Sequence, residues 1–140
     1  MTSDNPSALA ETITGIERSY EFMLAYAAQG RDFEDSSGSG PAIRQYLTRL
    51  RDGLANIAAL VEGYAVEPGK GPVFATYVDV IRVDAEKARA AVDVVLSLPS
   101  IGSQLVDNLN ASIHLRAVLT DIFLVDEALK SARRVKSKTD

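Results

Sequence analysis

Three long stretches of the chain carry apolar residues at alternating spacings of four and three, and this repeat restricts them to helices that pack side by side. A strand would alternate residue by residue and would be only about five or six residues long. The repeat positions are Leu9, Ile13, Ile16, Tyr20, Met23 and Ala27, then Ile43, Leu47, Leu50, Leu54, Ile57, Val61 and Tyr64, then Phe74, Val78, Ile81, Ala85, Ala88, Val92 and Val95.

Prolines and glycines mark where these helices begin and end. Pro6, Pro41 and Pro72 suit the first turn of a helix, and Gly30 and Pro99 suit the residues after one. The expected helices span 6–29, 41–65, 72–98 and 100–134. Because the connections are short, successive helices should run antiparallel. The sequence therefore predicts an all-α, up-down-up-down four-helix bundle.

The remaining segments are expected to be less ordered parts of one domain over 1–140. They are a flexible N-terminus at 1–5, a mobile loop at 31–40 and a basic C-terminal tail at 135–140. Phe33 is the one apolar residue in the loop "RDFEDSSGSG". It would either pack back onto the bundle or anchor a partner.

Two glycines lie inside the expected helices, where each costs about 1 kcal/mol relative to alanine. They are Gly15 and Gly53. We expect close backbone contact at one of them, since a close contact is the usual reason to keep a glycine there.

The composition excludes several classes of protein. The chain has no cysteine, so it holds neither a disulfide scaffold nor a thiolate nucleophile. The net charge of −4 argues against a nucleic-acid partner, although residues 130–140 are basic. No apolar run is long enough to span a membrane, and the acidic N-terminus does not suit a signal peptide. A cytoplasmic protein is expected.

The fourth segment has too many apolar residues for one buried stripe. Between 113 and 129 they cover more than half of the helix circumference, at 100° per residue. A second copy of the chain would cover the surplus, which predicts a homodimer through the fourth helix. The expected interface residues are Leu115, Leu119, Ile122, Phe123 and Phe33.

One polar stripe on the same segment is the candidate ligand site. Asp107, Asn110, His114 and Asp121 fall close to one helical face. A histidine between carboxylates suits acid–base chemistry, but a partly buried histidine with a structural carboxylate partner has the same pattern.

Other chemistries fit the sequence poorly. A di-iron bundle needs Glu-x-x-His pairs, and Ala111 stands three residues before the only histidine, so neither a metal nor a cofactor is expected. A histidine phosphotransfer bundle places a basic residue and then a glycine after its histidine, whereas "LRAV" follows His114. It is kept as a remote alternative.

The sequence thus favours a non-enzymatic helical module, homodimeric, that acts by binding another protein. The alternative is a small-ligand sensor or minor enzyme with a pocket around His114 and Asp121, where tyrosines would complete the lining.

Overall fold

The computed structural model describes residues 6–35, 38, 40–65 and 71–139, and these residues form helices and connections with no strand. The elements are α1 (Pro6–Ala27), a short 3₁₀ helix η1 (Gly40–Ala42), α2 (Ile43–Ala65), α3 (Gly71–Leu96), α4 (Ser103–Asn110) and α5 (Ile113–Thr139). The all-α prediction is confirmed, and the first three helices lie within a few residues of their expected bounds.

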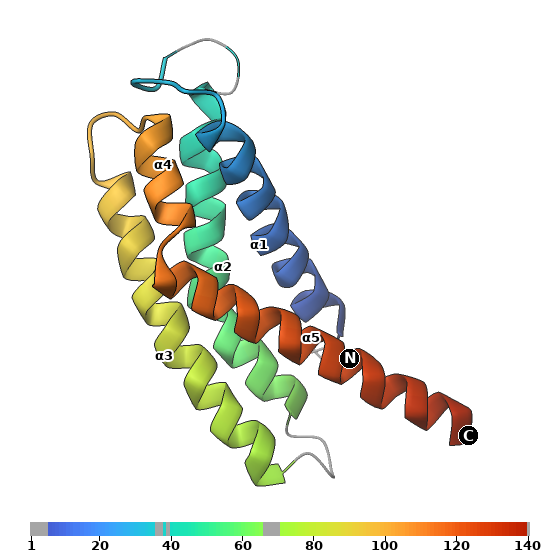
Figure 1. The fold of residues 1–140 in the computed structure, drawn as a ribbon. Helices are drawn as coiled ribbons and strands as arrows, with labels where there is room; N and C mark the ends of the chain where they lie inside the picture. The colour runs from blue at the N-terminus through green and yellow to red at the C-terminus, as the bar shows by residue number, and fades with distance from the viewer. Residues whose placement is uncertain (1–5, 36–37, 39, 66–70, 140) are drawn as a thin grey trace.

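The heptad stripes form the core. All seven repeat positions of α2 are buried, and in α3 all but the partly buried Phe74 are buried. In α1 the stripe is wider than the repeat indicates. Tyr26 is fully buried and donates a 2.6 Å hydrogen bond to the carbonyl oxygen of Ile101, whereas Tyr20 is only partly buried. Helices α1, α2 and α3 pack in chain order (Figure 1).

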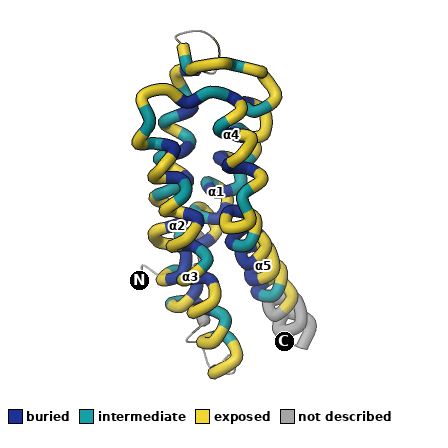
Figure 2. The backbone as a smooth tube through the Cα atoms, turned by 60° about the vertical axis from the view of Figure 1, so that its left-hand side comes forward, coloured by how far each residue is buried: buried dark blue, intermediate teal, exposed yellow. Residues whose placement is uncertain are grey.

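The fourth expected helix, 100–134, is wrong as a single element. It is two helices, and they pack on different neighbours: α4 lies against α1, and α5 lies against α3. Figures 1 and 2 show α5 running away from the first turns of α3 at an angle. The second helix also continues to Thr139, beyond the expected end, so the helix extends into the predicted basic tail.

The break at 111–112 has a local cause. The amide of Ser112 donates to the carbonyl oxygen of Leu109, which tightens and ends the last turn of α4. The hydroxyl of Ser112 then accepts a 3.2 Å hydrogen bond from the amide of His114, in the manner of a helix N-cap. The side chain of Asn110 is buried and donates to the carbonyl oxygen of Met23, which holds the end of α4 on α1.

The two helical glycines behave differently. A Cβ atom added at Gly53 would lie 2.8 Å from Cγ1 of the buried Ile16, so α1 and α2 approach closely there. A Cβ atom added at Gly15 would meet no atom within 4 Å. A close contact therefore exists at Gly53, but it is made with side chains of α1 rather than with its backbone.

The first part of the 31–40 loop is bound to the connection between α3 and α4. The amide of Arg31 donates to the hydroxyl of Ser103, and the amide of Ser103 donates to the carbonyl oxygen of Arg31. The amide of Ile101 donates to the carboxylate of Glu34, which also pairs with Arg44 at 2.8 Å. The sequence predicts mobility for the whole 31–40 loop, and this range includes Arg31 and Glu34, which form these hydrogen bonds. Residues 36, 37, 39 and the N-terminal 1–5 lie outside the described residues.

None of the helices, within their described residues, is long and apolar enough to cross a membrane.

Candidate functional site

The predicted polar stripe is divided by the helix break. Asp107 on α4 and His114 on α5 are both exposed, and Asn110 is buried against α1. Asp121 is buried on α5, only 7% exposed. No hydrogen bond or ion pair recorded among the described residues joins any two of these four. Asp121 is therefore the buried acidic residue of the stripe, and no recorded contact joins it to His114.

Asp121 is held by α3. The hydroxyl of Tyr77 donates a 3.0 Å hydrogen bond to Oδ1 of Asp121, and this bond joins the two helices. The second carboxyl oxygen, Oδ2, is buried and accepts no hydrogen bond. Buried carboxyl oxygens normally have a partner, because an unpaired one costs about 1–3 kcal/mol. One oxygen of this carboxyl group is thus hydrogen-bonded and the other is not.

A second carboxyl group, that of Asp84, also acts on Asp121. Asp84 lies seven residues after Tyr77, so the two side chains share a face of α3. Burial and then a hydrogen bond with the Asp84 side chain raise the pKa of Asp121 to about 7, although the Tyr77 hydroxyl acts in the opposite direction. Two neighbouring carboxyl groups hydrogen-bond only if one keeps its proton. A protonated Asp121 can therefore donate to Asp84.

Tyr77 stays a neutral donor throughout the ordinary pH range. Burial, followed by the hydrogen bond with Asp121, raises the pKa of Tyr77 to about 12. The three residues Tyr77, Asp121 and Asp84 are named the carboxyl cluster below. It brings a phenol hydroxyl and two carboxyl groups together between α3 and α5.

Two hollows border the carboxyl cluster. The first, named the α3–α5 groove, has a volume of about 270 Å³ and is lined by Val73, Phe74, Tyr77, Leu124, Val125 and Ala128. The second is an open recess of about 600 Å³ along α5, lined by Ala111, Ile113, Arg116, Ala117, Thr120 and Asp121. The groove is apolar apart from the Tyr77 hydroxyl. It suits another apolar surface better than a polar substrate.

The predicted interface residues fall into two groups. Leu115, Leu119 and Ile122 are buried inside this chain, at 4% exposure or less. They are therefore unavailable to a partner while α5 stays packed. Phe123 and Phe33 are exposed, at 46% and 58%. Helix α5 does expose large apolar side chains, at Ile113, Phe123 and Leu124. They are fewer than the sequence predicts.

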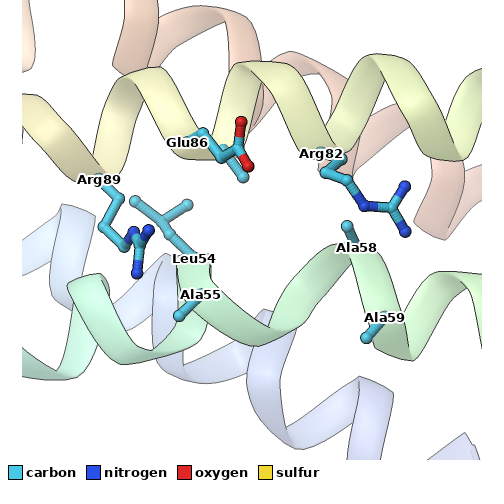
Figure 3. A pocket seen from close by; sticks show the side chains of 8 residues that line it. Leu54, Ala55, Ala58, Ala59, Arg82, Glu86 and Arg89 are labelled. Atoms are coloured by element: carbon cyan, nitrogen blue, oxygen red, sulfur yellow. The ribbon is translucent and has the colours of Figure 1, made fainter.

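A third hollow lies between α2 and α3 and is shown in Figure 3. It has a volume of about 200 Å³, and alanines from both helices form much of its lining. Arg82 at its edge is already paired with Glu62 and Asp79. Unlike the carboxyl cluster, none of the residues lining it has a buried polar atom that lacks a hydrogen bond, among the described side chains.

The sequence reasoning missed the partners of Asp121 on α3. Tyr77 lies one residue before a core position of the α3 heptad, and Asp84 lies one residue before another, Ala85. Polar side chains that flank core positions of α3 are the signal that could have located the cluster, because such positions lie at the boundary with a neighbouring helix. Within the described part of the chain, no group of three His, Cys, Asp or Glu side chains is placed to hold a metal ion.

Comparison with known proteins gives no relative. No family model matches the chain, and no curated protein or solved structure matches it significantly.

Proposed function

We propose that the protein is a non-enzymatic helical interaction module that works as a homodimer, with the α3–α5 groove and the outer face of α5 as its contact surface. The observation that carries the proposal is the apolar groove with exposed apolar residues at its rim. Val73 is 80% exposed and Leu124 is 58% exposed, and both line the groove. Phe123, beside Leu124, is also exposed.

The exposed side chains favour a partner on energetic grounds. Fully burying a large apolar side chain contributes about 1.5–3 kcal/mol. Isolated exposed apolar residues are common, but a continuous apolar patch marks a contact surface more often than not. The groove joins Val73 and Leu124 across two helices, so these side chains form one surface rather than scattered residues.

A second copy of the chain is the occupant that the groove fits best. A two-fold contact requires a surface that complements itself. This surface has both parts: a hollow between α3 and α5, and apolar side chains that project beside it at Phe123 and Leu124. In the dimer, the projecting side chains of each copy would enter the groove of the other. The packed core of each chain would stay intact.

Charge placed in the contact surface tests the proposal. Leu124→Glu should convert the dimer to a monomer that is still folded, because the side chain is exposed in the single chain. The matched control is Val94→Glu, also on an exposed apolar residue (62%) but about 30 Å further along α3 than Val73. It should leave the dimer unchanged. Light scattering reports both masses. If the two variants behave alike, the groove is not the contact surface.

Leu119 is unsuitable for this experiment. It is 4% exposed, so a charge there would enter the core of the chain. Loss of the dimer in such a variant would reflect unfolding rather than a broken contact.

A further inference from the structure

The second carboxyl oxygen of Asp121, Oδ2, is buried and has no hydrogen bond. The proposed contact surface does not explain this feature. Three facts of geometry meet there. Asp121 is 7% exposed, its Oδ1 accepts from Tyr77 on α3, and its Oδ2 is buried without a hydrogen bond. We propose that the carboxyl cluster is a proton-dependent clasp, which holds α5 against α3 while Asp121 is protonated and releases it when Asp121 ionises.

The closed state follows from the hydrogen bonds that a protonated Asp121 can make. Its Oδ1 accepts from Tyr77, and its protonated Oδ2 donates to the carboxylate of Asp84. Every polar group of the cluster is then satisfied, and two bonds join α5 to α3. Charge-assisted bonds of this kind, between an acid and a carboxylate, are stronger than bonds between neutral groups.

The open state follows from the loss of that proton to solvent. An ionised Asp121 has no proton for Asp84, so two carboxylates face each other at a buried site. Tyr77 remains a donor, because its pKa is raised to about 12. One hydrogen bond to a phenol does not offset a buried repulsion between like charges. Separation of the helices would let water reach both carboxylates.

Among the described residues, the groups that shift the pKa of Asp121 include no basic side chain. On α3, Tyr77 and Asp84 are the groups that act on the pKa of Asp121. On α5 itself, Arg116 and Thr120 border the open recess beside Asp121, and Arg116 has no resolved effect on that pKa. Helix α4 also contacts α5, and among its described residues no titratable group shifts Asp121.

The fold allows such a movement. α5 packs mainly on α3 and joins α4 through the two residues at 111–112. The helix break at Ser112 is a place where the direction of the chain can change without breaking a helix. Opening would widen the α3–α5 groove, which Tyr77 itself lines. The clasp does not depend on the proposed dimer, since its three residues belong to one chain.

The distance between two spin labels tests the clasp. The chain has no cysteine, so Ala75→Cys on α3 and Ser131→Cys on α5 give one label each at exposed positions. An excess of unlabelled protein restricts the measured pairs to one chain. Between about pH 5.5 and about pH 8.5, the label separation should shift to longer distances, with a midpoint near pH 7. Asp121→Asn, which accepts from Tyr77 and donates to Asp84 at every pH, should keep the short distance throughout.

Two controls make the result decisive. Labels at Glu11 on α1 and Asn56 on α2, both exposed, should show no shift, which separates opening from unfolding. Asp84→Asn should reduce the pH dependence and lower its midpoint, because the repulsion is lost while burial still raises the pKa of Asp121. An unchanged distance in the natural sequence, or an equal shift in Asp121→Asn, would overturn the clasp. Because the labels report on one chain, either outcome is independent of whether the protein is a dimer.

Discussion

The hydroxyl of Tyr77 on α3 donates a 3.0 Å hydrogen bond to Oδ1 of Asp121 on α5. This bond joins the two helices, and Tyr77 also lines the apolar groove between them. It connects the two features on which the functional account depends. The groove is the proposed contact surface, and the carboxyl cluster is the proposed clasp between the helices that form it.

The carboxyl cluster predicts how stability changes with pH. The pKa of Asp121 is raised from 3.8 to about 7 in the folded chain, so the folded state binds the proton more tightly than the unfolded state. Its contribution to stability is therefore full below pH 3.8 and is lost as the pH rises toward 7. We expect a loss on the order of 2 kcal/mol, which allows for the remaining contact with solvent.

Urea unfolding of the natural sequence and of Asp121→Asn isolates this contribution from those of the other carboxyl groups. The variant should gain free energy of unfolding relative to the natural sequence as the pH rises, and the gain should level off above about pH 7. A difference that stays constant between pH 4 and pH 8 would show that Asp121 does not titrate as the cluster requires.

The two helical glycines predict opposite effects of one substitution. Gly15→Ala should raise the free energy of unfolding by about 1 kcal/mol, because the position is open and alanine favours the helix. Gly53→Ala should lower it, since the new methyl group would press on Ile16 in the core. Thermal unfolding of both variants measures the contrast. Equal gains at the two positions would mean that α1 and α2 are not as close as the structure places them.

The hydrogen bonds of the 31–35 segment predict slow amide exchange where the segment is bound, at the end of the α3–α4 connection and the start of α4. The amides of Ile101 and Ser103 donate to Glu34 and Arg31, and Arg44 holds Glu34 while donating to the carbonyl oxygens of Leu96 and Leu98. Hydrogen exchange should show protection at Ile101 and Ser103. Arg44→Lys should reduce it, because lysine cannot reproduce the forked contact. Arg18→Lys, on the exposed side of α1, is the control.

Protection that is absent at Ile101 and Ser103 in the natural sequence would contradict this account of the segment. It would favour the mobile loop that the composition of 31–40 predicts.

The sequence predicted the helices well where one interaction dominates. In α2 each heptad position is buried, because packing on both α1 and α3 requires a continuous apolar stripe. It failed at 110–112, where the outcome depends on competition between a continuous helix and long-range contacts. Asn110 bonds to Met23, 87 residues earlier in the chain, and no local pattern encodes that partner.

The candidate site shows the same division. Asp121 was selected from the sequence as part of a polar stripe with Asn110 and His114, and the structure shows that it is buried. Its partners could not be selected, because Tyr77 lies 44 residues away and becomes adjacent only when α5 turns onto α3. His114 was grouped with Asp121 on the assumption of one continuous helical face. It lies in the first turn of α5 and is exposed.

The mass of the natural protein in solution tests the central claim most directly. The chain has a mass of 15.0 kDa, so sedimentation equilibrium at micromolar concentrations and about pH 6 should give about twice that value. The proposed clasp predicts a closed groove at this pH, because the pKa of Asp121 is raised to about 7. A mass of 15.0 kDa at every micromolar concentration would contradict the homodimer.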